Sequence, residues 1–426
     1  MSTDIVITSR PDAETLAGLY RDLHRHPELS FAETRTAGIV AASLSALGFE
    51  VTTGVGRTGV VGLLRRGNGP TVLLRGDMDG LPVLEETGLE YASTDRGTDP
   101  VGTDMPVMHA CGHDVHVTCL VGAAAELAAD DTWAGLLMVV AQPAEELGTG
   151  ARAMVADGIF ERFGRPDVVL GQHVGPMPAG MIGLHTGAAF ATSDSIKVTL
   201  YGRGGHGSRP EACVDPIVMA AAVVMRLQTI VSREVAGTET AVLSVGTLHA
   251  GTKVNIIPET AELEINVRTY DLRVRDRVLA AIERIVNAEA VASHAPKPPT
   301  VELVDSFPFL FNDLEGSART AAALRAVVGD TALIDPGPVT GSEDVGVFAL
   351  TADAPCVFWI LGGADPALFA GAATAVELLA VMADIPSNHS PNYAPVIEPT
   401  LGVGVAALVA AAKEWLGTSS AKLASR

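Results

Sequence analysis

Short apolar runs and amphipathic stretches alternate along the first part of the chain. Runs at 71–75, 136–141 and 168–172 have the length and the β-branched content of strands that are buried on both faces. Apolar residues recur with helical spacing over 13–47 and 116–129. Strands that alternate with helices predict an α/β fold, in which a mostly parallel sheet carries helices on both faces.

The pattern changes near residue 193. From there, apolar spacing predicts a strand, a long helix, two further strands and a second helix, over residues 195–201, 215–231, 240–248, 260–270 and 274–292. This order predicts a small α+β domain inserted into the larger one. We therefore expect a main domain over 1–192 and 305–426 that carries an inserted domain over 193–304.

Charge and cysteine usage narrow the range of partners and locations. The chain has 29 Lys and Arg against 50 Asp and Glu, a formal charge of −21, so no nucleic-acid partner is expected. Four scattered cysteines and a start without signal-peptide features predict a reducing, cytoplasmic location. The Ala-rich run 401–416 is predicted to be a buried helix, and no membrane association is expected.

Candidate metal ligands gather in the eight-residue run 109–116, HACGHDVH. Cys111 and His113 stand two apart, and in an extended chain their side chains share one face. A thiolate and an imidazole favour zinc or a similar divalent ion. The alternative is a buried cysteine beside surface histidines, and further candidate ligands downstream argue against it.

A pair of carboxylates follows the predicted strand 136–141. Glu145 and Glu146 cannot both point the same way, so one can bind metal while the other faces a water molecule. A solvated loop is the alternative for an isolated Glu-Glu pair. His173 ends an apolar run and His389 lies in a turn-rich loop. Five candidate ligands are too many for one tetrahedral zinc and suit two ions about 3.5–4 Å apart.

A glycine-rich turn, GRGGHG at 202–207, follows the predicted strand 195–201. It matches a dinucleotide-binding pattern, but Arg209 and Pro210 interrupt the position where the required helix would begin. We therefore interpret it as a flexible turn that presents His206, with a merely solvated histidine as the alternative.

The whole series of motifs resembles the M20 metallopeptidase family, within it the amidohydrolase branch of hippurate hydrolases, N-acyl-L-amino acid amidohydrolases and auxin-conjugate hydrolases. The motifs that carry the resemblance lie at 23–31, 75–82, 109–116, 143–146, 202–207, 251–258, 341–344 and around His389. The resemblance implies a zinc-exopeptidase-like α/β fold and two divalent ions (zinc, manganese or cobalt). It places the metal ligands at Cys111, His113, Glu146, His173 and His389, with Cys111 as a candidate bridge.

The resemblance also implies roles around the metals. Glu145 falls on the general acid/base position, and Asp79 on a residue that orients a ligand. His206 would polarise the scissile carbonyl, with Asn255 near it. Arg268 is a candidate for the substrate carboxylate, because a guanidinium fork suits that task. Where the branch usually has a histidine, this chain has Glu211 near the presumed substrate entrance.

The implied reaction is hydrolysis of the amide bond of N-acyl amino acids through a metal-bridging water that Glu145 activates. A dipeptidase or carboxypeptidase of the same family is the alternative, and an inactive metal-binding protein is a remote one. The resemblance further implies a homodimer through the inserted domain, with that domain acting as a lid and His206 supplied by the partner subunit.

Overall fold

The protein is described here by a computed structural model that covers residues 5–99, 101–372 and 374–418. It divides into a larger unit (Met1–Ala189, Phe311–Gly337 and Asp344–Arg426) and a smaller unit (Phe190–Leu310 and Pro338–Glu343). The smaller unit begins and ends a few residues outside the predicted insert, 193–304. It also takes in 338–343, a segment far along the chain that the sequence pattern did not assign to it.

The larger unit is built on one sheet in the order β1-β2-β6-β3-β7-β18-β8-β17, with β19 beside β6. Its strands are β1 (Glu50–Val55), β2 (Gly59–Arg66), β3 (Thr71–Asp77), β6 (Trp133–Gln142), β7 (Val168–Pro178), β8 (Ile182–Gly183), β17 (Leu333–Ile334), β18 (Cys356–Ala364) and β19 (Gly417–Thr418). The four central strands, β6, β3, β7 and β18, are parallel. β1, β2 and β8 run antiparallel to their inner neighbours.

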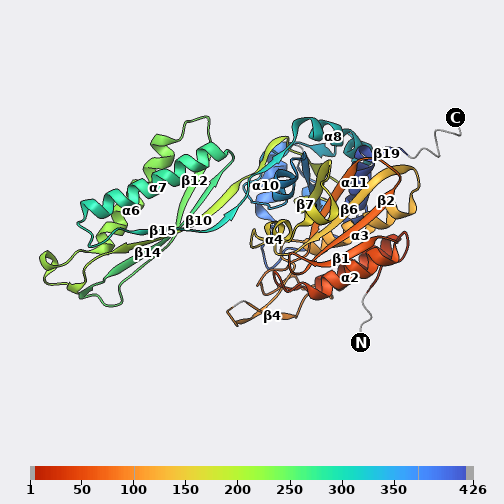
Figure 1. Ribbon diagram of the computed structural model, residues 1–426. Helices are drawn as coiled ribbons and strands as arrows, with labels where there is room; N and C mark the ends of the chain where they lie inside the picture. Colours follow the sequence, from red (N-terminus) through yellow and green to blue (C-terminus); the bar gives the residue numbers. More distant parts are fainter. Residues whose placement is uncertain (1–4, 100, 373, 419–426) are drawn as a thin grey trace. The chain divides into compact units, whose positions relative to one another are not determined.

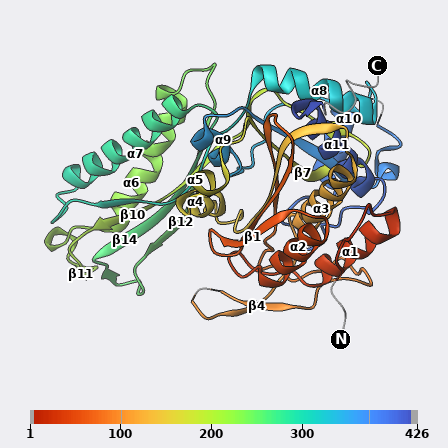
Figure 2. The ribbon, with the colours of Figure 1, turned by 45° about the vertical axis from the view of Figure 1, so that its right-hand side comes forward.

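Helices cover both faces of this sheet, as Figure 2 shows for the larger unit. They are α1 (Ala13–Arg25), α2 (Thr34–Ala46), α3 (His113–Ala129), α4 (Gly150–Ala156), α5 (Ile159–Phe163), α8 (Leu314–Val328), α9 (Gly346–Ala352), α10 (Ala375–Asp384) and α11 (Thr400–Trp415). α3 and α11 pack against each other and against β3 and β7, whereas α4 and α9 pack together on β6 and β7. The predicted α/β class is therefore confirmed.

Burial explains why the central strands read as continuous apolar runs. In β6, Leu137 and Val139 enter the core formed with α1, α3 and α11. Their neighbours Met138 and Val140 point the opposite way and are equally buried. A strand covered on both faces has no solvent side, so its sequence does not alternate between polar and apolar residues. A short hairpin, β4 (Arg96–Thr98) and β5 (Asp104–Pro106), stands outside the sheet.

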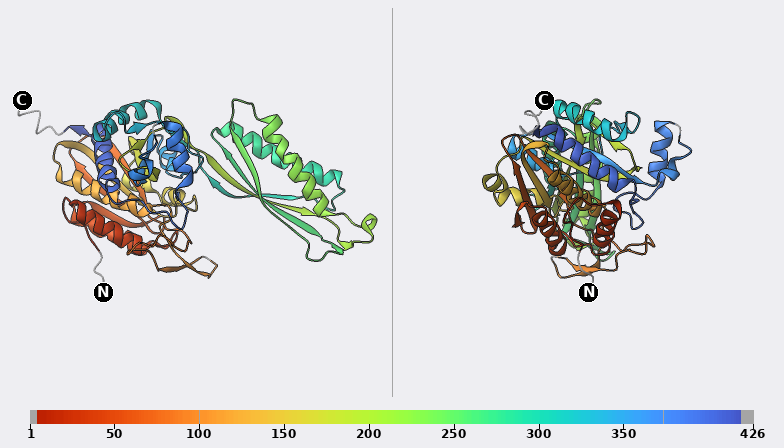
Figure 3. Two further views of the ribbon diagram at one scale, coloured as in Figure 1. Left: turned by 180° about the vertical axis from the view of Figure 1, so that it is seen from behind. Right: turned by 90° about the vertical axis from the view of Figure 1, so that its right-hand side faces the viewer.

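The smaller unit is an antiparallel sheet in the order β12-β14-β10-β15 (Figures 1 and 3). Its elements are β10 (Thr192–Tyr201), β11 (Gly205–His206), α6 (Pro216–Thr229), β12 (Ala241–Ala250), β13 (Ile256–Ile257), β14 (Thr260–Thr269), α7 (Leu272–Ala292) and β15 (Thr300–Phe307). Alternate residues such as Val198 and Leu263 form a second core with the two helices. β15 is a fourth strand, which the sequence pattern did not predict.

Two further elements connect the units along the chain: β9 (Gly187–Phe190) and β16 (Leu310–Asn312), which pair with each other. Short helical turns occur at Pro210–Ala212, Ile230–Glu234 and Pro366–Phe369. By length and composition alone, the helical stretch Pro216–Glu234 could cross a membrane. It is not the run 401–416 considered from the sequence. Met219, Val223 and Leu227 of this stretch lie in the core of the smaller unit, whereas Val218 and Met225 are exposed.

A buried charge cluster ties the first helix to the start of α3. The side chain of His24 in α1 is fully buried, with Nδ1 2.6 Å from Asp114 and Nε2 3.0 Å from Glu85. Burial lowers the pKa of His24, but the hydrogen bonds and charges of Asp114 and Glu85 outweigh it and raise the pKa to about 9. The imidazolium therefore stabilises the fold as long as it stays protonated.

This pKa shift predicts a pH-dependent stability. The folded pKa of His24, about 9, lies above its unfolded value of about 6.5, so the stabilisation is complete below pH 6.5 and is lost as the pH rises through 9. We expect the melting temperature of the wild type to fall more steeply between pH 6.5 and 9 than that of His24→Asn. His249→Asn, at an exposed position of β12, is the control. Equal slopes in all three proteins would contradict the prediction.

Candidate metal centre

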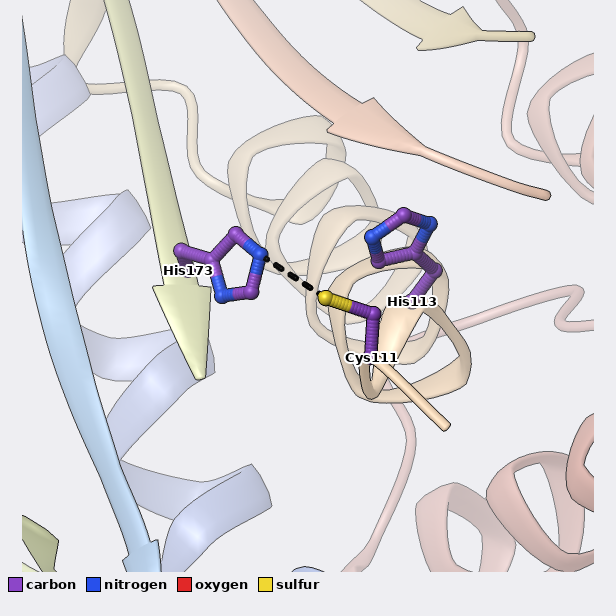
Figure 4. Close-up of side chains that lie close together, drawn as sticks. All are labelled: Cys111, His113 and His173. Carbon is purple, nitrogen blue, oxygen red and sulfur yellow. Dashed lines mark hydrogen bonds between the residues drawn. The ribbon is translucent and has the colours of Figure 1, made fainter. Parts of the chain in front are cut away.

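Three predicted ligands meet where α3 begins beside β7 (Figure 4). The Sγ atom of Cys111 lies 3.5 Å from Nε2 of His173. Ligand atoms of Cys111, His113 and His173 all lie within 4.8 Å of one another. The sequence placed His173 at the end of its strand, but β7 continues to Pro178.

The local geometry that joins Cys111 to His113 differs from the predicted one. The two residues do not share a face of an extended segment, because His113 is the first residue of α3 and Gly112 before it is left-handed, with φ 81°. A Cβ atom on Gly112 would lie 2.4 Å from a methyl group of Val174. Only glycine allows this left-handed turn. The thiol of Cys111 and the imidazole of His113 are therefore brought together by the turn at Gly112, and not by the alternation of side chains along a strand.

The other two predicted ligands join the group through Cys111. Ligand atoms of Cys111, Glu146 and His389 lie within 4.8 Å of one another, and Nε2 of His389 is 3.4 Å from Oε1 of Glu146. His389 is held at a positive φ of 72°, and its amide donates to the carbonyl of Ala110. Asn388 donates to the carbonyl of Cys111 at 3.0 Å. The loop that carries His389 is thus fastened to the loop that carries Cys111.

Asp79 positions both the glutamate pair and His113. Its two carboxylate oxygens accept the backbone amides of Glu145 and Glu146, each at 3.1 Å. Oδ1 of Asp79 also lies 3.3 Å from Nδ1 of His113, and Ser30 donates to Oδ2. Nε2 of His113 lies 3.9 Å from a carboxylate oxygen of each glutamate. Asp79 occurs in no cluster of candidate ligands among the described residues.

The protonation preferences show an excess of buried negative charge. Burial lowers the pKa of His113, but Asp77, Asp79 and Glu146 outweigh it and raise the pKa to about 10. Burial, followed by the charges of Glu146 and Glu145, raises the pKa of the Cys111 thiol well above its ordinary value. Without a cation the thiol stays protonated and the imidazole takes up a proton. A positively charged ion at this place would reverse both preferences.

The donor set fits a divalent metal ion. Nδ1 of His113 faces Oδ1 of Asp79, whereas Nε2 of the same ring is buried without a hydrogen-bond partner among the described residues. Burial lowers the pKa of His173 well below its ordinary value, and its Nδ1 lies 2.8 Å from the carbonyl of Val174. The tautomer that donates there leaves Nε2 with a lone pair directed toward Cys111. Unpaired buried nitrogens of this kind are what a metal ion satisfies.

A set of buried polar residues behind the site was not singled out from the sequence as a group. Arg75 of β3 donates to Asp77 at 2.7 Å, to Gln142 at 2.8 Å and to Asp344 at 3.2 Å. The two nitrogens of His116 are both engaged, by Asp77 and by the amide of Val174. His116 is therefore a packing and hydrogen-bonding residue. An arginine inside an apolar run, at Arg75, was the available signal that a carboxylate network lay behind it.

Three predicted residues belong to the smaller unit. His206 in β11 is exposed. Its Nδ1 accepts the backbone amide of Ser208 and lies 2.8 Å from the hydroxyl of the same residue. The carbonyl of Asn255 accepts the amide of Gly207, so Asn255 and His206 are neighbours. Arg268 in β14 donates to the carbonyl of Thr340 at 2.7 Å. It thereby fastens the segment 338–343 to the smaller unit.

Comparison with known proteins identifies the class. A family model for peptidase family M20/M25/M40 matches residues 73–414. Hippurate hydrolase of Campylobacter jejuni is 39% identical over 331 residues, 76% of this chain and 82% of that protein. Thermostable carboxypeptidase 1 of Saccharolobus solfataricus is 35% identical over 348 residues, 80% of this chain and 84% of that protein.

A solved structure agrees with these relatives. The crystal structure of a dinuclear metal binding peptidase of the M20 family from Bacillus subtilis is similar with a TM-score of 0.73 and 27% identity, covering 95% of this chain and 99% of that one. Fold and donor set thus define a metal-binding hydrolase. The chain belongs to the M20 peptidase family and to its amidohydrolase branch, so the predicted family is confirmed.

The cluster predicts that Cys111 is needed for metal content. Cys111→Ser replaces a soft thiolate by a hard, weakly acidic hydroxyl, so we expect metal affinity to fall by about 10- to 100-fold. Bound zinc or manganese would be measured by atomic emission after dialysis against a metal buffer. Cys213→Ser, which changes a partly exposed cysteine of the smaller unit, should leave the metal content unchanged. Full metal content in the Cys111→Ser variant would rule out the thiolate ligand.

Proposed function

We propose that this protein hydrolyses the amide bond of N-acyl amino acids with the help of two divalent ions, and releases a carboxylic acid and a free amino acid. The observation that carries the proposal is the placement of Glu145 beside His113 and Glu146, which belong to the overlapping groups of candidate ligands. Its backbone amide is fixed by Asp79, and its carboxylate lies 3.9 Å from Nε2 of His113. A carboxylate held beside a metal cluster is suited to general acid/base work.

The residues divide the task of hydrolysis between them. Cys111, His113, Glu146, His173 and His389 would hold the ions. Bound ions supply Lewis acidity and lower the pKa of water. Glu145 takes the proton of the attacking water and returns it to the nitrogen of the leaving amine. Asp79 holds the backbone of both glutamates in place, because the amides of Glu145 and Glu146 donate to its carboxylate.

The names of the relatives support one kind of scissile group in the substrate. Hippurate hydrolase and a carboxypeptidase both act next to an amino acid with a free carboxylate, and both are similar to this chain over most of its length. We therefore expect the substrate to contain an amide whose nitrogen belongs to a terminal amino acid. We propose Arg268 for its carboxylate and His206, with Asn255 nearby, for the developing negative charge on the carbonyl oxygen.

The surroundings of the enzyme complete the proposal. We propose a cytoplasmic homodimer in which the smaller unit forms the interface and His206 comes from the partner subunit.

Zinc, manganese and cobalt all suit a set of one thiolate, one carboxylate and three imidazoles. Glu211 is exposed and lies 3.5 Å from Arg209, so its charge is partly compensated.

A substrate panel tests the proposed reaction. The purified protein would be given zinc, manganese or cobalt and assayed on N-acetyl and N-benzoyl amino acids beside dipeptides. We expect metal-dependent release of free amino acid from the acylated substrates. Cleavage of dipeptides alone would assign a dipeptidase instead. Full metal loading without turnover of any of them would contradict the proposed function and favour an inactive metal-binding protein.

The role of Glu145 makes a sharper prediction. Glu145→Gln keeps the shape of the side chain but cannot accept the proton of water, so kcat should fall by about 100- to 10,000-fold. Metal content should stay near that of the wild type. Glu161→Gln, at an exposed position of α5, is the control and should keep full activity. Unchanged turnover in the Glu145→Gln variant would exclude Glu145 as the base.

A further inference from the structure

A second buried carboxylate holds the loop of the proposed base. Glu33, at the start of α2, is completely buried. Its Oε1 accepts the amide of Ala144 at 2.9 Å and that of Phe31 at 2.8 Å, and its Oε2 accepts the hydroxyl of Thr58. The contact with Ala144 spans 111 residues of sequence. It joins the first helices to the residue that immediately precedes Glu145.

The segments bonded to Glu33 have strained backbones. Among the described residues, six that are not glycine have a positive φ, and three of them lie on these segments. Phe31 has φ 62°, Ala144 has φ 48°, and Arg57, which precedes Thr58, has φ 90°. A residue with a side chain keeps such a conformation only where its surroundings over-determine it. The buried carboxylate supplies that constraint through hydrogen bonds to donors on all three segments.

Glu33 and Asp79 together bind three consecutive amides. Glu33 accepts from Ala144, and Asp79 accepts from Glu145 and Glu146. Burial and the charge of Asp79 raise the pKa of Glu33 to about 7, so above pH 7 the side chain is mostly ionised and its hydrogen bonds are charge-assisted. The left-handed turn at Ala144 sets the direction in which the chain leaves β6, and hence where the Glu145 carboxylate is placed.

We propose that Glu33 is a positioning residue for catalysis: it holds Ala144 in its left-handed conformation and thereby aims Glu145. The proposal rests on the proposed function, in which Glu145 is the base. Glu33 touches neither the ligand cluster nor, in this role, the substrate. Its loss should therefore misplace the base without emptying the metal site.

The test is Glu33→Gln, which keeps the size of the side chain but removes its charge and part of its accepting capacity. We expect kcat on the best amide of the substrate panel to fall by about 10- to 100-fold, with KM and metal content changed less than about threefold. Independently of activity, the amide of Ala144 should exchange its hydrogen about tenfold faster, as measured by mass spectrometry of peptides that cover 143–150.

A second change separates aiming from folding. Glycine adopts positive φ at no steric cost, so Ala144→Gly should let the loop reach its conformation without Glu33. We expect the double variant E33Q/A144G to recover part of the kcat lost in E33Q. If Glu33 served folding alone, a glycine at residue 144 would not restore the kcat lost in E33Q. Should E33Q fail to fold, Glu33→Asp takes its place, since it keeps the charge and only withdraws the oxygens.

A matched control lies on the same segment. Glu28 accepts the amides of Arg35 and Thr36 at 2.9 and 2.8 Å, so it also holds the start of α2 but makes no contact with the loop at 144. Glu28→Gln should leave kcat and the exchange of Ala144 unchanged. Wild-type kcat in E33Q, or an equal loss in E28Q, would overturn the proposal. Absence of turnover in the metal-loaded wild type would instead refute the proposed function, so the two failures are distinguishable.

Discussion

The site depends on a concentration of buried negative charge at one end of the central sheet. Asp77, Asp79, Glu145 and Glu146 all approach His113, whose ring is fully enclosed. Carboxylates removed from water are costly unless cations and hydrogen-bond donors compensate them. Arg75 compensates Asp77 from behind, and backbone amides compensate Asp79. The remaining negative charge, on Glu145 and Glu146, is suited to binding divalent ions. The same buried carboxylates therefore affect both the stability of the fold and the affinity for metal.

Much of the machinery around the site consists of carboxylates that bind backbone amides. Asp79 and Glu33 fix the loop at 144–146, and Asp344 accepts the amide of Ala151 in the helix that follows. A loop after a strand is otherwise free to vary, since its amides have no ladder to join. Binding these amides to buried acids converts a loop into a rigid platform. Glu145 thus lies on a backbone segment whose amides are held by two buried carboxylates.

The smaller unit follows a different physical logic. Its sheet buries one face under α6 and α7 and leaves the other polar, so its strands alternate between apolar and polar residues. Arg268 and Tyr270 bind carbonyl oxygens of the segment 338–343 and make it part of this unit. The following residue, Asp344, is anchored by Arg75 and Gln142 in the larger unit. A single peptide bond therefore separates segments that belong to the two different units.

By itself, the sequence determined the α/β class, three of the four central parallel strands, three strands and both helices of the smaller unit, and the helices α3 and α11, because burial on one face or on two leaves a periodicity that is local in the chain. The sequence also predicted a ligand set through its resemblance to a family, and the structure brings those side chains into overlapping groups of candidate ligands. Only the tertiary structure decided the left-handed turn at Gly112 that joins Cys111 to His113, the strand β15, the membership of 338–343, and the contact of Glu33 with Ala144. Each of these depends on residues far apart in the chain or on space left by neighbours such as Val174. No local pattern records a contact of that kind, since its partners become neighbours only when the sheet has assembled.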